Sequence, residues 1–220
     1  MKKNTRKLKK AVLLLCSAVL LVCISIGATV AYLTSQDTVT NTFTVGNVAI
    51  TMDEAKVGAD GKAITGDAAE RVKANAYKLF PGGEYDKDPT IHVGTTSEEA
   101  YLGVKVVFKD GKKADNLGLN LLGIFDGFSS SSWTISEKQI SGNDVYYTLI
   151  YNTTISGGTN DIVLFNKVKI PGELDNDDIA LLDNVQMEIT AYAVQKDGFN
   201  SAAKALSTAF EGVFPAPAGA

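Results

Sequence analysis

Residues 32–52 read YLTSQDTVTNTFTVGNVAITM, and apolar residues alternate there with small polar ones. From Val39 onward one side of this segment carries Val39, Asn41, Phe43 and Val45, and threonines fill the positions between them. Strict alternation of this kind predicts a half-buried β-strand. After the Gly46-Asn47 pair the apolar residues change parity, so a bulge or tight turn is expected before a second strand segment.

A removable membrane-targeting segment precedes this strand. Six positive charges and no acid lie in residues 1–10, residues 11–26 contain no charge, and small residues follow up to Ala31. This arrangement is typical of a secretory signal peptide, so we predict that residues 1–31 are removed by cleavage between Ala31 and Tyr32. The alternative is an uncleaved anchor, but the apolar run is shorter than the ~20 residues that span a bilayer. Cleavage would make residues 32–45 a free N-terminal strand.

The composition of residues 32–220 limits the partners and the chemistry. This segment holds 15 basic and 25 acidic residues, a net charge of −10, which argues against nucleic acid and anionic membranes as partners. We therefore expect membrane contact only during export. Both cysteines, Cys16 and Cys23, lie in the apolar run, so the exported domain would contain neither a disulfide nor a thiol nucleophile.

The rest of the chain predicts a mainly β protein that ends in a helix. Alternating strands are expected at 101–108, 133–140, 145–151, 162–170 and 185–194. Leu206, Phe210 and Val213 recur at helical spacing after a cap at Asn200 or Ser201. Because strands and helices do not alternate, we predict an antiparallel two-sheet, jelly-roll-like sandwich with long loop insertions. It would form a single domain over residues 32–214, followed by a disordered tail at 215–220.

Residues that would carry chemistry are few. His92 is the only histidine, and there is no HExxH, G-x-S-x-G or P-loop motif. We therefore expect no catalytic residue, no metal ligand and no cofactor, with His92 in a structural or exposed position. The acidic segment 173–178 offers oxygen ligands for Ca²⁺ but lacks the pattern of an EF-hand, so a solvated loop is the preferred interpretation and calcium binding stays open.

Several stretches, taken in order, resemble the TasA/camelysin family of secreted Gram-positive proteins, which a SipW-type signal peptidase processes. They are the small-residue exit before Tyr32, the N-x-F-x-x-G run at 41–46, the turn at 79–82 with the segment 88–91, and the ending 191–199. The resemblance covers both ends and the middle, but not the loops at 53–78 and 110–131. It implies a jelly-roll-like sandwich, an extracellular matrix or cell-surface location, and polymerisation into biofilm fibres.

The expected function is that of a structural fibre subunit that adds its N-terminal strand to the open sheet edge of the next copy. The polymerisation strand would present Val39, Asn41, Phe43 and Val45, and the partners would be other copies of the chain and related matrix proteins. Pairing of this strand within its own domain is the alternative. A secreted camelysin-like metallopeptidase and a monomeric cell-surface adhesin or binding module are the competing functions.

Overall fold

The computed structural model describes residues 34–37, 47–182 and 185–217, with only the backbone described for 34–37. The chain divides into two units, Met1–Tyr32 and Leu33–Ala220, and all described residues belong to the second. The expected cleavage site at Ala31 and Tyr32 lies outside the described residues. No helix in the described ranges is long and apolar enough to cross a bilayer.

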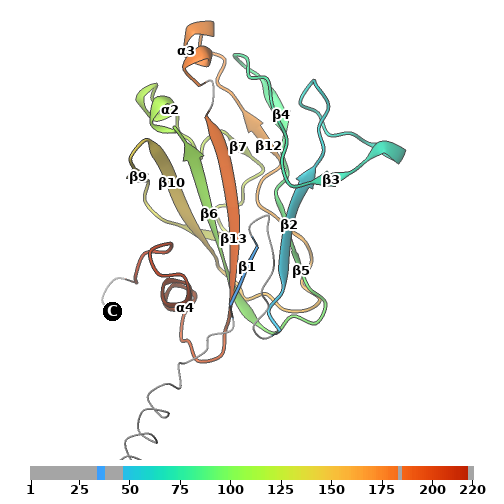
Figure 1. The fold of residues 1–220 in the computed structure, drawn as a ribbon, viewed down its shortest axis with the longest axis vertical. Coiled ribbons are helices and arrows are strands. Elements are labelled where there is room, and N and C mark those ends of the chain that lie inside the picture. Colours follow the sequence, from blue (N-terminus) through green and yellow to red (C-terminus); the bar gives the residue numbers. More distant parts are fainter. Residues whose placement is uncertain (1–33, 38–46, 183–184, 218–220) are drawn as a thin grey trace, which may run out of the picture. The chain divides into compact units, whose positions relative to one another are not determined.

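The largest sheet of the described region is antiparallel and six-stranded (Figure 1). Its strand order is β1-β13-β6-β10-β8, and β9 also pairs with β10. The strands are β1 (Thr34–Asp37), β6 (Ala100–Lys109), β8 (Trp133–Ile135), β9 (Gln139–Ser141), β10 (Asp144–Tyr151) and β13 (Gln186–Gln195). The strands expected at 101–108, 145–151 and 185–194 are confirmed. The strand expected at 133–140 is divided into β8 and β9, and both pair with β10.

Two smaller antiparallel sheets complete the β structure of the described residues. One has the order β11-β5-β2-β3 and the other the order β4-β12-β7. Their strands are β2 (Ile50–Ala55), β3 (Arg71–Val72), β4 (Glu84–Asp86), β5 (Thr90–Val93), β7 (Phe125–Asp126), β11 (Ile162–Val163) and β12 (Lys167–Lys169). The described region therefore has three sheets where the sequence predicted two.

The third sheet arises because the strand predicted at 162–170 is divided. Ile162–Val163 pair with β5, whereas Lys167–Lys169 pair with β4 and β7. Between the two strands lies Phe165, which is fully buried and stacks on Phe125 with ring centroids 4.0 Å apart. The chain thus changes sheets while its side chains stay in the core.

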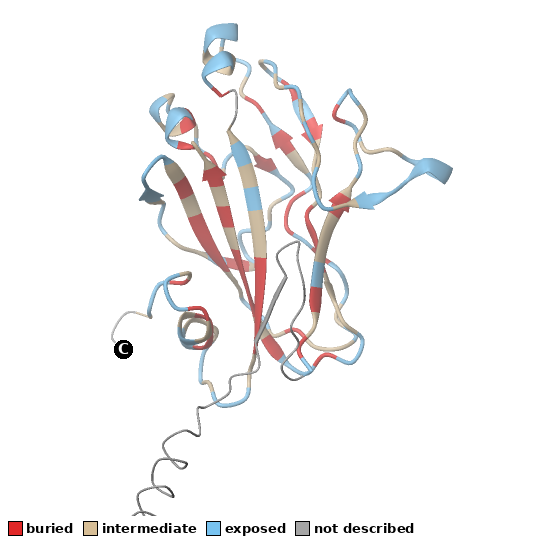
Figure 2. Ribbon diagram, viewed as in Figure 1, coloured by how far each residue is buried: buried red, intermediate tan, exposed pale blue. Residues whose placement is uncertain are grey.

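One hydrophobic core draws on all three sheets (Figure 2). Strand β6 contributes Leu102, Val104, Val106 and Phe108, which are all buried, as the alternation predicted. Ile50 and Ile91 come from the second sheet, and Tyr85 and Val168 from the third. The described elements therefore form a β-sandwich-like arrangement.

Short helices lie outside the sheets. They are the 3-10 turn η1 (Gly66–Ala68) and the α-helices α2 (Lys112–Asn116), α3 (Asn176–Leu181) and α4 (Ala202–Ala209). The predicted C-terminal helix is confirmed as α4, and Ser201 caps it by accepting a hydrogen bond from the Lys204 backbone N–H at 3.3 Å.

Helix α4 covers the outer face of the large sheet. Leu206 and Phe210 pack with Tyr192, Val194 and Phe214 in a second buried cluster. This cover explains why β13 buries consecutive residues from Ala191 to Val194 instead of every second one. From Gln186 to Ile189, β13 keeps the expected alternation of exposed and partly buried residues.

Candidate functional site

The candidate site is the edge of strand β13 that faces away from β6. On one side β13 pairs with β6 along its whole length. On the other side it pairs with β1 in antiparallel register, from Thr34 opposite Val194 to Asp37 opposite Ala191. Within the described residues the part of this edge from Gln186 to Thr190 pairs with no strand. The N–H and C=O groups along such an edge are the groups to which an added strand binds.

Strand β1 also contacts β2 of the second sheet and is drawn between β13 and β2 in Figure 1. The partner of β2 on one side is β5, and β3 pairs with it only at Glu54 and Ala55. The N-terminal segment therefore enters where an edge of the large sheet meets an edge of the second sheet. A strand at this position can hydrogen-bond to β13 while the side chains of one of its faces point toward the hydrophobic core.

The predicted polymerisation residues are not among those that the structure describes. Val39, Asn41, Phe43 and Val45 all lie between β1 and the start of the described segment at Asn47. The structure therefore places only the backbone of Thr34–Asp37, which pairs with β13 of the same chain. The role of the four residues stays a prediction.

His92 lies on β5 and binds two carboxylates. Its Nδ1 is 2.8 Å from Asp161 Oδ1 and its Nε2 is 3.0 Å from Asp53 Oδ1. Burial opposes the charged imidazolium, but the hydrogen bonds to the two aspartates outweigh it and raise the pKa of His92. Both ring nitrogens are thus engaged with carboxylates, as expected for a structural histidine. The described residues contain no group of three or more side chains that could hold a metal ion.

The acidic segment 173–178 is not a plain loop, which corrects the prediction. Helix α3 begins at Asn176, and Asp175 caps it by accepting hydrogen bonds from the backbone N–H groups of Asp177 and Asp178, both at 2.9 Å. The Asp178 side chain in turn accepts a hydrogen bond from the Asp175 backbone N–H at 3.2 Å. This reciprocal capping box gives two of the acids a structural role at the helix start.

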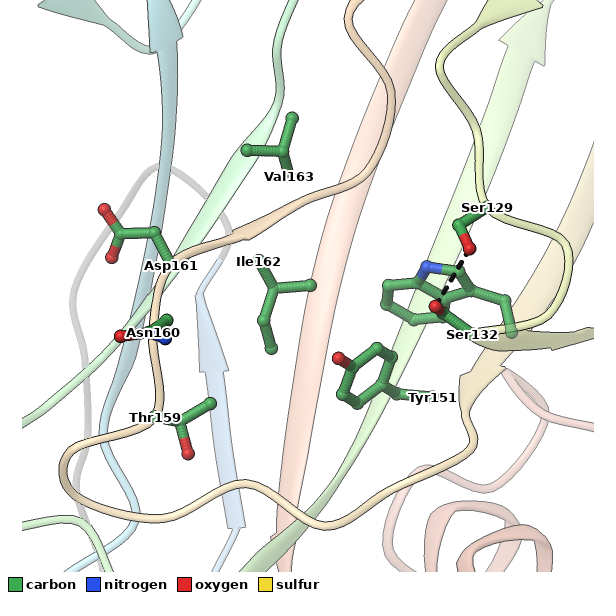
Figure 3. Close-up of a pocket in the computed structure, with 9 residues that line it drawn as sticks. Ser129, Ser132, Tyr151, Thr159, Asn160, Asp161, Ile162 and Val163 are labelled. Atoms are coloured by element: carbon green, nitrogen blue, oxygen red, sulfur yellow. Dashed lines mark hydrogen bonds between the residues drawn. The ribbon is translucent and has the colours of Figure 1, made fainter.

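A small pocket lies between the loop before β8 and the segment that leads into β11. Its volume is about 350 Å³, and Figure 3 shows Ser129, Ser132 and Tyr151 facing Ile162 across it. The Ser129 and Ser132 hydroxyls lie 3.0 Å apart and bind each other. His92 binds Asp53 and Asp161, so the chain's only histidine activates neither serine.

Sequence analysis missed one group of polar residues that the structure buries. Glu54 lies inside β2 and is only 4% exposed. Its carboxylate binds the Lys87 amine and the Asn75 amide. A signal was present, because Glu54 has the same parity as Ile50 and Met52 and so continues their inward-facing row.

Comparisons with known proteins add no relative. No family model, no curated protein and no solved structure matches the chain. The functional argument therefore depends on the residues and on their geometry.

Proposed function

We propose that the protein is a secreted structural subunit of an extracellular fibre or biofilm matrix. In this proposal each copy adds its N-terminal strand to the open edge of the next copy, as the resemblance to the TasA/camelysin family implies. The observation that carries the proposal is the antiparallel pairing of Thr34–Asp37 with the edge strand β13. It supports the view that this edge is built to receive the N-terminal segment.

The register of that pairing agrees with the alternation of the sequence. Each step from Thr34 towards Asp37 moves the partner one residue back along β13, from Val194 to Ala191. A strand that continues this register brings Val39 opposite Ile189 and Phe43 opposite Val185. Ile189 and Val185 pack against the main hydrophobic core.

The apolar side of the strand would therefore add to the core of the acceptor. Side chains of directly opposed residues lie on the same face of an antiparallel pair. Val39, Asn41 and Phe43 would face the core beside Ile189 and Met187, which are only partly buried in the described chain. The intervening threonines would face outward. This arrangement gives the strand both backbone hydrogen bonds and side-chain burial as sources of affinity.

Donation to a neighbour would produce a filament. A contact in which a terminal strand of one copy binds an edge of the next is heterologous and does not close, so it continues without limit. Cleavage after Ala31 would free the strand only on export, which would prevent assembly inside the cell. The jelly-roll topology and the membership of the TasA/camelysin family belong to this same proposal.

The same pairing favours one competing function. Residues Thr34–Asp37 pair with β13 of their own chain, as they would in a monomeric cell-surface adhesin or binding module. The two functions differ in which copy supplies the strand. A test must therefore report whether the strand and the edge belong to one chain or to two.

A pair of engineered cysteines makes this distinction. Ser35 lies opposite Ala193, and opposed Cα atoms of an antiparallel pair are roughly 4.5–5.5 Å apart, within the range that a disulfide spans. Residues 32–220 contain no cysteine, so the double variant Ser35→Cys/Ala193→Cys introduces the only pair in the secreted form. We expect a ladder of covalent multimers on a non-reducing gel of the secreted, oxidised protein.

The control variant is Ser35→Cys/Ile189→Cys, which moves the second cysteine four residues along β13 and should give no ladder. Monomers with an internal disulfide in the Ser35→Cys/Ala193→Cys protein would refute donation and support the monomeric module. The N-terminal residue of the secreted protein should be Tyr32, and a retained leader would also contradict the proposal.

A further inference from the structure

A buried carboxylate joins a lysine and an asparagine from two other segments of the chain. Glu54 Oε2 accepts a hydrogen bond from Lys87 Nζ, and Glu54 Oε1 accepts one from Asn75 Nδ2 at 3.0 Å. The side chains of Glu54 and Lys87 are 6% and 13% exposed. An amine and an acid are thus largely removed from bulk water, and a partly buried amide binds the acid.

The amide of Asn75 is fixed at both of its polar atoms. Its Oδ1 accepts a hydrogen bond from the Val57 backbone N–H at 3.0 Å, and its Nδ2 also donates to the Ala55 carbonyl at 2.8 Å. A backbone N–H directed at the amide oxygen draws electron density from the carbonyl carbon. The same N–H is placed to stabilise negative charge if that carbon is attacked.

An aromatic ring screens the amine. Lys87 Nζ lies 5.8 Å from the ring centroid of Tyr77, whose hydroxyl donates to the Asp86 carbonyl at 3.0 Å. Burial, reinforced by the negative charge of Glu54, raises the pKa of Tyr77, so this phenol stays neutral. A lysine amine in such a site becomes a nucleophile once it passes its proton to a neighbouring base.

We propose that Lys87 and Asn75 form an intramolecular isopeptide bond, with Glu54 as the catalytic acid and base. Lys87 transfers a proton to Glu54, and the neutral Nζ attacks Cγ of Asn75. The oxygen of the tetrahedral intermediate is held by the Val57 N–H. Glu54 gives its proton to Nδ2 and takes the second proton from Nζ, the Cγ–Nδ2 bond breaks, and ammonia leaves. Ammonia then takes the remaining proton from Glu54 as ammonium, which restores the carboxylate.

This bond would supply a covalent link that the exported chain otherwise lacks. Residues 32–220 have no cysteine and therefore no disulfide. The proposal depends on neither export nor fibre assembly, so it stands apart from the proposed function.

Mass spectrometry of the folded full-length chain, as purified, tests the bond directly. Trypsin should release residues 74–78 joined to residues 79–105, because an acylated Lys87 is no longer a cleavage site. We expect this linked species, and an intact protein lighter than its sequence mass by one ammonia. Separate peptides 74–78, 79–87 and 88–105 together with an unreduced intact mass would overturn the proposal.

Variants separate this reaction from cyclisation of Asn75 to a succinimide, which also releases ammonia. Lys87→Arg should restore the full mass if the bond is an isopeptide, whereas a succinimide would persist. Glu54→Gln should also stay unlinked, and efficient linkage in that variant would refute the role of Glu54. The matched control is Lys56→Arg, because Lys56 binds Glu70 at the surface at 2.8 Å and should leave the link intact.

Discussion

Replacement of His92 by glutamine should remove a pH-dependent part of the stability. His92 bridges Asp53 on β2 and Asp161 before β11, with contacts of 3.0 and 2.8 Å. Burial lowers the pKa of the imidazole, but hydrogen bonds from its two nitrogens to Asp53 and Asp161 more than offset this, so the folded-state pKa is raised. The charged form therefore binds more strongly in the folded chain than in the unfolded one.

The sign of the effect follows from this shift. The contribution of His92 is fully present below its unfolded pKa of about 6.5 and is lost as the pH rises through the higher folded value. The pKa of Asp53 is lowered: burial raises it, but hydrogen bonds from His92 and Arg71 have the larger combined effect, so Asp53 stays ionised in this window. Wild type should exceed His92→Gln in stability near a pH of about 5.5, and the difference should shrink near a pH of about 8.5.

The expected difference in stability between wild type and His92→Gln is small. The Asp161 side chain is 61% exposed and contributes little, whereas Asp53 and His92 are 25% and 29% exposed. We estimate roughly 1 kcal/mol at the lower pH, because this is the upper range for partly exposed ion pairs. With an m-value of about 2 kcal/mol/M, this corresponds to a shift of about 0.5 M in the urea midpoint.

Trp133 provides the assay. It is the only tryptophan and is 4% exposed, so its fluorescence should change on unfolding in urea. The control is Glu188→Gln, which removes an exposed acid on β13 and should give no change with pH over the same window. If the difference in urea midpoint between wild type and His92→Gln stays constant, or widens as the pH rises, the reasoning is refuted.

Three further predictions concern the packing, a helix cap and the acceptor edge. Leu206→Ala should lower the free energy of unfolding by roughly 2–5 kcal/mol in urea titrations, because Leu206 of α4 is fully buried against the large sheet. Asp175→Ala should cost α3 about 1 kcal/mol and speed hydrogen exchange of the amides that it caps. Ile189→Lys should reduce filament yield in electron micrographs, whereas Thr190→Lys on the opposite face of β13 should have a smaller effect. Equal filament yields from the two lysine variants would contradict the proposed strand register.

The long strands and α4 were predictable because their signals are local. Strand β6 buries Leu102, Val104, Val106 and Phe108 on one face, so the alternation of its apolar residues identifies the face that packs into the core. The parity of the segment 162–170 was also correct, since Ile162 and Val168 are both buried. Parity says which face a residue takes but not which strand lies beside it. The change of sheet between β11 and β12 therefore could not be read from the pattern.

The acidic segment shows a signal that was present but misinterpreted. Asp175 and Asp178 have the spacing of a capping box, in which each side chain binds the backbone N–H of the other residue. A short helix with few buried residues leaves little apolar periodicity, so composition favoured a loop. The spacing of the two aspartates was the better guide than their charge.

The buried polar cluster shows what the sequence alone cannot supply. Glu54 could have been recognised as inward-facing from Ile50 and Met52, and an inward-facing acid requires partners. Its partners come from positions 75 and 87, which do not belong to β2 and carry no apolar pattern of their own. Only the three-dimensional arrangement shows that one carboxylate binds both an amine and an amide.

Strand β2 takes part in both proposals, which gives them a physical connection. Strand β2 contacts β1, and Glu54 lies near the C-terminal end of β2. A bond between Lys87 and Asn75 would tie the segment after β3 to the segment before β5 across that end. The edge of β2 would then keep its geometry when a neighbouring strand is bound, without any disulfide. Because linkage requires only the folded chain, a linked protein that does not assemble would refute the fibre proposal alone, and an unlinked filament would refute the isopeptide alone.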